Sequence, residues 1–362
     1  GNSVKKVLII STIGIGYEGM SSVLYNFLSN MSRNEISVDI AVYKDINPKV
    51  LLDFEKIAGI RYVHDRKNDF IKYIKDLKRI FPEYSVVHIN GNSSTMLVEY
   101  YMAKKSGVDR IILHNHSAST EHPLFNKITR PLIRNVKAEK LACSELSGEW
   151  LFGKENYKVL NNAIDVKRFA YNNIYRKQLR ESLNVKNAFF VGHIGHFSTV
   201  KNHEFIIEVF SEFVKMRQDA VLGLVSDGPT LEKIKIMVDN KKLKDKVLFL
   251  GRQQNPEYYY SAFDAFIFPS LNEGFGLVAI EAQATGLPVL ASTGVPRATR
   301  CSNIISYKEL DAGAKEWAKE LVNISKMNIN RSDQGWKKNI VEHGFDIRQQ
   351  ANKLLNIYLN CE

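Results

Sequence analysis

The sequence predicts an α/β fold in which helices cover parallel sheets. Short apolar runs bounded by turn residues alternate with longer amphipathic stretches, the pattern of repeated β-α units. The 362 residues, 44% of them apolar, suggest two domains at about 150 residues per domain. A polar, charged stretch at 161–186 separates two series of strands. We therefore expect one domain over residues 1–165 and a second over 166–344.

The elements follow in order along the chain. Apolar runs of strand length occur first at 7–13, 36–43, 60–63, 86–89, 110–114, 140–143 and 158–160. The second series lies at 189–194, 221–225, 247–250, 265–268, 288–291 and 304–306. Helical periodicity fills the gaps, for example at 20–29 and 70–81, and a last amphipathic helix at 347–359 has no strand after it.

Charge and composition narrow the functional classes. The net charge of +11 favours contact with phosphates, nucleic acid or an anionic membrane. No run of about 18 apolar residues occurs, so we expect no transmembrane helix. Cys143, Cys301 and Cys361 are far apart and form no Cys-x-x-Cys pair, which favours a reducing compartment and disfavours a thiolate zinc site. The start shows no signal-peptide pattern, so a cytoplasmic location is expected.

A glycine-rich loop follows the first predicted strand. Residues 14–19 match the Gly-x-Gly-x-x-Gly dinucleotide pattern. A nicotinamide site also needs an acidic residue at the end of the second strand, and neither Asp39 nor Asp45 is well placed. A nicotinamide site and a simple tight turn stay open as alternatives. We favour a loop that brings Gly16 close to an anion or substrate.

A second loop joins the strand at 189–194 to a helix that begins near Asn202 or Glu204. It contains glycines, hydroxyls, His196 and Lys201 at the carboxyl end of a strand, where backbone N–H groups and a lysine can hold a phosphate. The simpler alternative is a solvated lysine in a turn.

Residues 273–281 follow the strand at 265–268 and begin another helix. Two glycines at the turn allow backbone N–H groups at 275–277 to point at a pyrophosphate, whose charge the helix dipole favours. Glu273 and Glu281 are eight residues apart, which predicts that they face the same side of the helix and accept hydrogen bonds from different hydroxyls of one ligand. For Glu273 the alternative is a simple dipole contact in the first turn.

Two histidines lie at the carboxyl end of the strand at 110–114. Alternation places His114 and His116 on one face, at the edge where ligands of open α/β sheets bind. A zinc pair is an alternative for which no third ligand is obvious, and purely structural histidines are another.

At these residues the chain resembles the retaining family 4 (group 1) glycosyltransferases, especially bacterial exopolysaccharide and capsule enzymes. Residues 269–289 are similar to their Glu-x7-Glu segment, 195–202 to their phosphate loop and 225–229 to their Gly-Asp-Gly-Pro turn. The resemblance spans nearly the whole chain. It implies a GT-B fold: two Rossmann-like, doubly wound domains that face across a cleft, with a C-terminal helix at 345–362 packing back on the first domain.

The resemblance also implies roles for individual residues. Lys201 is expected to contact the donor diphosphate, Glu281 the ribose, Arg252 the base, and Glu273 and His116 the donor sugar. We expect catalytic roles for His116 and Glu273, and donor binding by Gly16, His196, Lys201, Asn202, Arg252, Gly274, Phe275, Gly276, Leu277 and Glu281. One departure matters: His196 replaces the family's arginine, so a permanent bidentate charge is lost.

The expected activity is therefore a retaining, metal-independent transfer of a hexose from a nucleotide sugar, UDP-linked, to a glycan or polyprenyl-linked acceptor in surface-polysaccharide biosynthesis. No cofactor, metal or nucleic acid partner is expected. Two alternatives stay open: a hydrolysing UDP-sugar 2-epimerase, which shares the two-domain shape, and a non-catalytic nucleotide-sugar-binding relative.

A basic amphipathic helix is predicted over residues 124–140. Its cations recur at three- and four-residue steps between apolar residues, and Pro131 is expected to kink or start it. The cations are Lys127, Arg130, Arg134, Lys137 and Lys140. We expect peripheral docking on the anionic inner face of the cell membrane, with a solvated helix face as the alternative.

Overall fold

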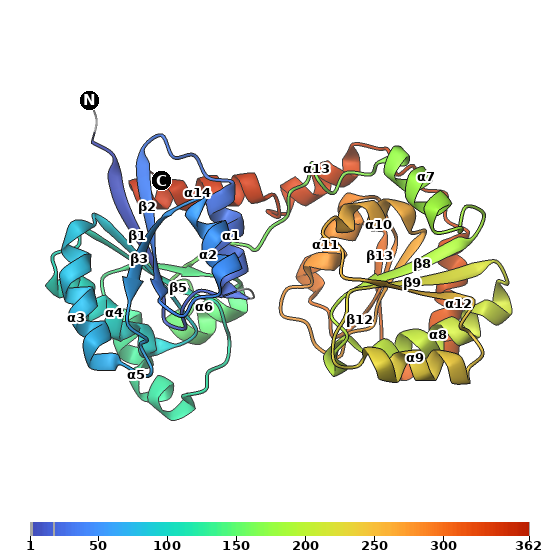
Figure 1. Ribbon diagram of the computed structural model, residues 1–362, viewed down its shortest axis with the longest axis horizontal. Coiled ribbons are helices and arrows are strands. Elements are labelled where there is room, and N and C mark those ends of the chain that lie inside the picture. Colours follow the sequence, from blue (N-terminus) through green and yellow to red (C-terminus); the bar gives the residue numbers. More distant parts are fainter. Residues whose placement is uncertain (1–2, 17–18, 362) are drawn as a thin grey trace. The chain divides into compact units, whose positions relative to one another are not determined.

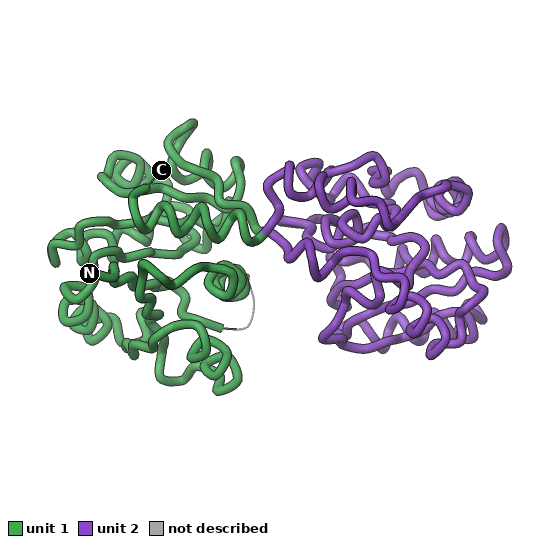
Figure 2. The backbone as a smooth tube through the Cα atoms, turned by 90° about the horizontal axis from the view of Figure 1, so that it is seen from above, with its two compact units in different colours: residues 1–162, 347–362 green, residues 163–346 purple. Residues whose placement is uncertain are grey.

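The computed structural model describes residues 3–16 and 19–361. The chain divides into two compact units, one formed by residues 1–162 with 347–362 and one by 163–346 (Figure 2). The boundaries expected from the sequence, after residue 165 and before residue 345, lie within three residues of these. Each unit contains one parallel sheet covered by helices on both faces, so the α/β prediction is confirmed (Figure 1).

The first unit is built on a seven-stranded sheet of order β3-β2-β1-β4-β5-β6-β7. Its strands are β1 (Lys5–Ser11), β2 (Ile36–Tyr43), β3 (Gly59–Val63), β4 (Val86–Gly91), β5 (Arg110–Asn115), β6 (Glu139–Ala142) and β7 (Lys158–Val159). The strand order reverses between β1 and β4, which makes the carboxyl ends of these two strands the place where a ligand of such a sheet binds. The Thr12 N–H donates to the Asn90 carbonyl at 2.9 Å and joins the two ends.

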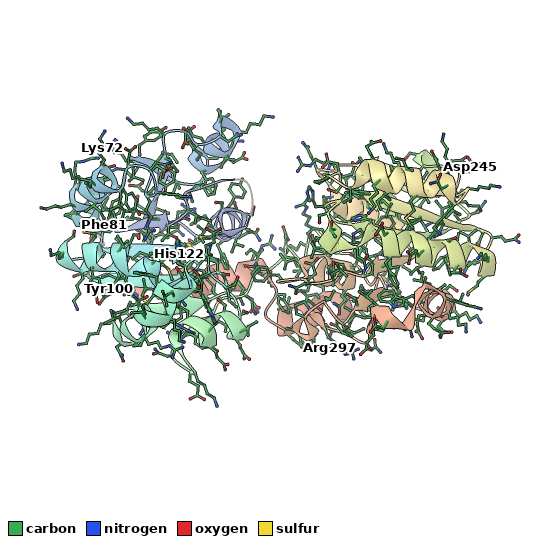
Figure 3. The ribbon with its side chains drawn as sticks, turned by 90° about the horizontal axis from the view of Figure 1, so that it is seen from below. Lys72, Phe81, Tyr100, His122, Asp245 and Arg297 are labelled. Carbon is green, nitrogen blue, oxygen red and sulfur yellow. The ribbon has the colours of Figure 1, made fainter. Side chains whose placement is uncertain are left out.

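Helices cover both faces of this sheet. They are α1 (Met20–Ser29), α2 (Pro48–Glu55), α3 (Phe70–Ile80), α4 (Leu97–Lys105), α5 (Pro123–Asn135), α6 (Glu145–Phe152) and α14 (Ile347–Leu359). On the face of α3 and α4 the core includes Phe81 and Tyr100, which are labelled in Figure 3. The strand expected at 7–13 lies two residues earlier because Ile13, although apolar, is 62% exposed in the loop after β1.

The C-terminal helix α14 packs on the first unit. Its Tyr358 hydroxyl is 2.7 Å from His88 Nδ1 on β4, and its Ile357 carbonyl accepts a 2.6 Å hydrogen bond from Arg110 Nε on β5. Gln350 Oε1 accepts from the Asn161 N–H at 3.0 Å. These side chains are buried or partly buried, so the helix is part of this unit's core and not an appended tail.

The second unit has a six-stranded parallel sheet of order β10-β9-β8-β11-β12-β13. Its strands are β8 (Phe189–Ile194), β9 (Ala220–Val225), β10 (Val247–Gly251), β11 (Ala265–Phe268), β12 (Val289–Ser292) and β13 (Ile305–Lys308). Its helices are α7 (Asn173–Ser182), α8 (His203–Met216), α9 (Leu231–Asn240), α10 (Pro256–Ala262), α11 (Leu277–Ala284), α12 (Ala314–Ser325) and α13 (Gly335–Glu342). The order reverses between β8 and β11, so the loops after these strands adjoin at the switch point.

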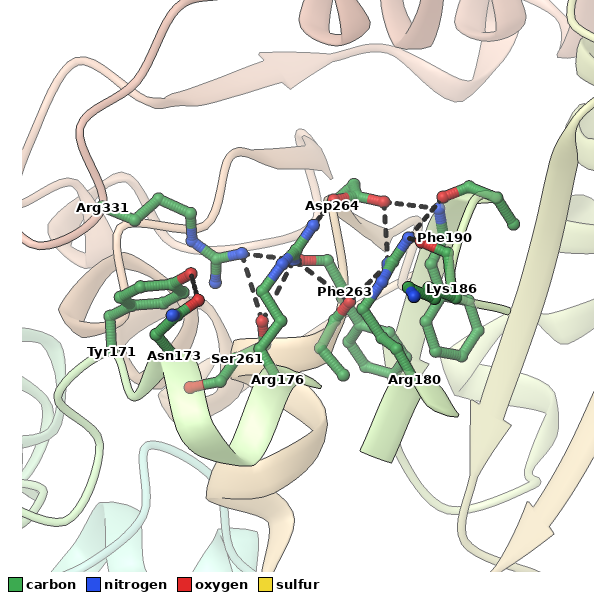
Figure 4. Close-up of polar contacts among 12 residues, drawn as sticks. Tyr171, Asn173, Arg176, Arg180, Lys186, Phe190, Ser261, Phe263, Asp264 and Arg331 are labelled. Carbon is green, nitrogen blue, oxygen red and sulfur yellow. Dashed lines mark hydrogen bonds and ion pairs between the residues drawn. The ribbon is translucent and has the colours of Figure 1, made fainter. Parts of the chain in front are cut away.

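An arginine cluster fastens α7 to the start of β11 (Figure 4). Asp264 binds Arg176 at 2.5 Å and Arg180 at 3.0 Å, and its Oδ2 also accepts from the Phe190 N–H at 2.7 Å. Arg331 donates to the Phe263 carbonyl at 2.7 Å. Because each charge is paired or bound to carbonyls, the cluster can be buried without an unpaired ion.

The basic helix is shorter than expected. The helix α5 ends at Asn135, not at residue 140, and Pro131 lies inside it instead of at its start. Lys140 belongs to β6, is buried, and donates to the Arg134 carbonyl at 2.9 Å, so the prediction that it adds to an exposed basic face is wrong. The periodicity continued past the helix because a strand that begins at Glu139 carries the same apolar and basic residue types.

Candidate functional site

In the second unit, the loops after β8 and β11 are joined by three contacts. The Leu271 N–H donates to the Val200 carbonyl at 2.9 Å, and Asn202 Nδ2 donates to the Pro269 carbonyl at 3.0 Å. Lys201 Nζ forms an ion pair of 2.5 Å with Glu273 Oε1. The structure thus brings together Lys201, Asn202 and Glu273, three of the residues that the sequence singled out.

The Glu273 carboxylate is held by more than the lysine. Ser270 donates its hydroxyl to Glu273 Oε1 at 2.8 Å, and the Glu273 N–H donates to the Gly294 carbonyl at 3.0 Å. A Cβ on Gly294 would lie 2.5 Å from the Leu271 carbonyl oxygen, so only glycine allows this approach. Sequence reasoning missed Ser270 and Gly294 as partners of Glu273, although Ser270 lies directly after the strand end where ligand-binding residues are expected.

The two glutamates are not related by helical spacing. Helix α11 begins at Leu277, after Gly276 with a φ of 72°, so Glu273 lies in the loop before the helix and only Glu281 belongs to the helix itself. Gly276 bends the chain just before the helix, and the contacts with Lys201 and Ser270, not the helical repeat, hold Glu273. Gly274 and Phe275 are exposed in the bend, and the first N–H groups of α11 follow directly. They offer donors and a positive dipole end to an anion.

Glu281 lies inside α11 in a different environment. Tyr260 donates its hydroxyl to Glu281 Oε1 at 3.3 Å. Burial raises the pKa of Glu281 to about 7, opposed by this hydrogen bond and by the nearby charge of Arg168. The carboxyl group therefore changes its charge close to neutral pH, unlike an ordinary glutamate.

The loop after β8 packs on the Ser-Asp-Gly-Pro turn at residues 226–229. The Phe197 N–H donates to the Asp227 carbonyl at 2.8 Å, and Arg252 Nε lies 3.3 Å from Asp227 Oδ1. The side chain of Arg252 is 73% exposed and His196 is also exposed. His196 thus lies exposed in the loop and Arg252 lies exposed beside it.

In the first unit, two backbone N–H groups of the glycine loop after β1 already donate hydrogen bonds within the protein. The Gly14 N–H donates to the Ser11 carbonyl, and the Gly16 N–H donates to the Ser21 hydroxyl at 2.9 Å. A Cβ on Gly14 would lie 2.6 Å from the Tyr43 ring. The Gly16 amide is thus engaged by α1, which weakens its predicted role as a phosphate donor. Residues 17 and 18 of this motif lie outside the described residues.

His114, in β5, and His116, directly after it, lie together, as alternation predicted. The rings of His114 and His116 are 4.0 Å apart between centroids, and His116 Nε2 lies 2.9 Å from Asn90 Oδ1 at the end of β4. Asn90 was not singled out from the sequence, although it directly follows the predicted strand at 86–89. Among the described residues, no group of three or more His, Cys, Asp or Glu side chains is arranged to hold a metal ion.

Buried histidines continue the cluster away from the surface. His88 Nε2 lies 3.0 Å from His114 Nδ1, and His88 Nδ1 lies 2.7 Å from the Tyr358 hydroxyl. Burial lowers the pKa of His88 and of His116 to about 3 and also lowers that of His114. All three rings are therefore neutral at pH 7.

The fold and the two loops define a class of α/β protein: two Rossmann-like units, each with polar residues at its switch point. Residues 175–300 match the family described as glycosyl transferases group 1, and 252–355 match family 4 glycosyltransferases in conflict systems. These matches confirm the predicted resemblance to the group 1, family 4 glycosyltransferases. The region contains most of the predicted donor-binding residues.

Individual relatives extend the resemblance over the whole chain. The chain is 24% identical to the putative glycosyltransferase EpsF of Bacillus subtilis, over 99% of this chain and 97% of that protein. It is 24% identical to the Escherichia coli UDP-Gal:alpha-D-GlcNAc-diphosphoundecaprenol alpha-1,3-galactosyltransferase, over 80% and 81% of the two chains. The crystal structure of Anabaena HepE in complex with UDP matches with a TM-score of 0.80 and 18% identity, over 98% of this chain and all of that one. The likeness confirms the GT-B fold class.

Proposed function

We propose that this chain transfers a hexose from a UDP-linked sugar to a glycan or polyprenyl-linked acceptor in surface-polysaccharide biosynthesis, with retention of configuration and without a metal. The observation that carries the proposal is the convergence of Lys201, Glu273 and the first N–H groups of α11 at the switch point between β8 and β11. An anion-binding helix end beside a lysine and a carboxylate suits a diphosphate joined to a sugar. The relative that uses UDP-Gal and the relative solved with UDP support the same donor class.

The ion pair between Lys201 and Glu273 suggests how the donor is received. A diphosphate carries more negative charge than one carboxylate, so it draws Lys201 Nζ away from Glu273 Oε1. The carboxylate, still oriented by Ser270, then accepts a hydrogen bond from a sugar hydroxyl. Binding of the donor thus reorganises one contact and keeps the rest of the loop in place.

The same groups lower the barrier to transfer. Negative charge develops on the diphosphate as the glycosidic bond breaks, and Lys201 with the helix N–H groups stabilises it there. In front-face attack the leaving phosphate oxygen accepts the proton of the acceptor hydroxyl, so Glu273 is not required as a base. His116, neutral and in the first unit, is assigned to the donor sugar.

The test uses purified protein with a panel of UDP-sugars. Lys201→Ala and Glu281→Ala each remove a charged or hydrogen-bonding contact and should weaken donor binding about tenfold to hundredfold, as measured by calorimetry. His116→Ala should lower the rate of UDP release more than the affinity. Unchanged donor affinity in both of the first two variants would contradict the assignment.

A non-catalytic nucleotide-sugar-binding relative is a second candidate, favoured by His196 in place of the family's arginine. The same panel separates the candidates by their products. Acceptor-dependent release of UDP supports transfer, and tight binding without turnover supports the second candidate. Interconversion of UDP-sugars would instead support a 2-epimerase.

We further propose that α5 docks on an anionic lipid surface. Its outer face exposes Leu124, Ile128 and Leu132, at 71%, 68% and 53%, in a row of four-residue steps. Lys127 beside them is exposed, whereas Arg130 and Arg134 donate to carbonyls of α6, so the apolar row contributes more than the predicted basic face. Within the described residues, no helix combines the length and apolar character needed to cross a membrane.

A further inference from the structure

Asn90 lies at the switch point of the first unit, and its side-chain amide can adopt only one orientation. Its Nδ2 is 3.3 Å from the Ile10 carbonyl and 3.3 Å from the His88 carbonyl. Carbonyl oxygens only accept hydrogen bonds, so the NH2 group must face them. A flipped amide would bring Oδ1 against two carbonyl oxygens in a buried site, where such repulsion is costly. Asn90 Oδ1 therefore faces His116.

The orientation of Asn90 determines the proton position on His116. Oδ1 can only accept, so the 2.9 Å contact requires a proton on His116 Nε2. A neutral imidazole carries one proton, which leaves Nδ1 with a free lone pair. Burial holds the pKa of His116 at about 3, so the ring does not gain a second proton at neutral pH.

The lone pair is accessible to a ligand. His116 is partly exposed. Within the described residues its Nδ1 has no hydrogen-bond partner, and this atom is not buried. One face of the His116 ring packs on His114, whose Nδ1 lies 3.0 Å from His88 Nε2. Asn90 at Nε2 and the stacked His114 ring thus hold the His116 ring, and Nδ1 is the acceptor atom that remains available.

We propose that Asn90 is a positioning residue that holds His116 in the Nε2–H tautomer, so that Nδ1 accepts a hydrogen bond from a hydroxyl group of the bound sugar. An acceptor at this atom excludes a phosphate oxygen as the partner, because a phosphate oxygen has no proton to donate at neutral pH. The hydroxyl part of this inference rests on the proposed function, whereas the tautomer does not.

The tautomer is measured on the free protein, labelled with ¹⁵N-histidine, by two-bond ¹H–¹⁵N correlation spectra at pH 7.5. His116→Gln identifies the His116 signals by their loss. The wild type should show a protonated Nε2 and an unprotonated Nδ1 at His116. A proton on Nδ1, or on both nitrogens, would overturn the proposal without any variant of Asn90.

The positioning role is tested with Asn90→Ala, which should mix the two tautomers and lower kcat for UDP release about threefold to tenfold, the value of one neutral hydrogen bond, with little change in KM. Asn126→Ala is the matched control, because Asn126 is an equally buried asparagine of the same unit whose Oδ1 accepts from Ser94. It should keep the wild-type tautomer. An Asn90→Ala variant that keeps the pure Nε2–H tautomer would refute the positioning role.

Addition of UDP-glucose or UDP tests the contact with a sugar hydroxyl separately from the tautomer. UDP-glucose should shift the His116 Nδ1 resonance, and UDP alone should not, because it lacks the hydroxyls of the glucose. If UDP-glucose raises the melting temperature and leaves Nδ1 unmoved, the hydroxyl contact is wrong. If UDP-glucose does not bind at all, the proposed function fails while the tautomer measurement still decides the role of Asn90.

Discussion

Single residues in the second unit carry chemistry that their neighbours create. Glu281 is an ordinary glutamate in the sequence, and its raised pKa arises from burial and, to a smaller extent, from the nearby charge of Glu257. Ser226 is another case. Its φ of 109° lies in a region that side chains with a Cβ rarely adopt, at the position where the resembled family has glycine in the Gly-Asp-Gly-Pro turn.

Ser226→Gly should therefore stabilise the protein. Glycine removes the backbone strain, worth about 1 to 3 kcal/mol, at an entropic cost of about 0.5 to 1 kcal/mol in the unfolded chain. We expect a net gain of about 1 kcal/mol, measured as a higher urea midpoint. Ser226→Ala keeps the Cβ and should give no gain; an equal gain in both variants would show that φ is not the cause.

Glu281 predicts a pH-dependent affinity for the donor. Ribose hydroxyls donate to an ionised carboxylate, and the pKa of about 7 means that protonation competes with this contact below neutral pH. The affinity for UDP-glucose should fall between pH 8 and pH 6, by about tenfold per pH unit at most. Calorimetry in a His196→Gln background keeps the measurement free of the exposed histidine side chain in the loop after β8. The pH dependence of the affinity should vanish when Glu281→Gln is added. A pH dependence that persists would contradict the role of Glu281.

At the scale of elements, α5 shows most clearly how a pattern and its packing differ. The alternation of basic and apolar residues indicated an amphipathic helix, but two of its arginines turn inward to carbonyls of α6, and the apolar row faces outward instead. A helix that turns two arginines inward and exposes three large aliphatic side chains beside a lysine is suited to burial in an anionic lipid interface.

Ile128→Glu should release the protein from anionic vesicles. Loss of one buried aliphatic side chain is worth about 1.5 to 3 kcal/mol, so the bound fraction in liposome flotation should fall about tenfold or more. Ile236→Glu on α9 is the control, since Ile236 is 60% exposed in the other unit. Equal binding of both variants, or no binding of the wild type, would end the membrane proposal.

At the scale of the whole molecule, both units hold neutral histidines at their switch points. His88 and His116 in the first unit and His193 in the second have pKa values lowered by burial to about 3, 3 and 4. Below their ordinary value of about 6.5, the unfolded chain binds protons that the folded chain does not. Their contribution to stability is therefore complete above pH 6.5 and is lost progressively as the pH falls.

The free energy of unfolding should accordingly decrease from pH 7 to pH 5, by about 2 kcal/mol for each fully buried histidine. Glu281 acts in the opposite direction, because its raised pKa favours the folded state at low pH, but one carboxyl group does not outweigh several histidines. Urea midpoints at the two pH values test this. His193→Gln should reduce the difference and the exposed His122→Gln should not; a protein as stable at pH 5 as at pH 7 would refute the assignment.

The sequence by itself determined the strands, their division into two sheets and the loops that carry Lys201, Glu273 and His116. These features depend on local periodicity and on glycines at strand ends, both of which are present in short stretches of the sequence. Only the tertiary structure decided which side chains meet. The pairing of Lys201 with Glu273, of Glu281 with Tyr260 and of His116 with Asn90 joins residues 21 to 72 positions apart. Such contacts depend on strand order and burial, which no local pattern encodes.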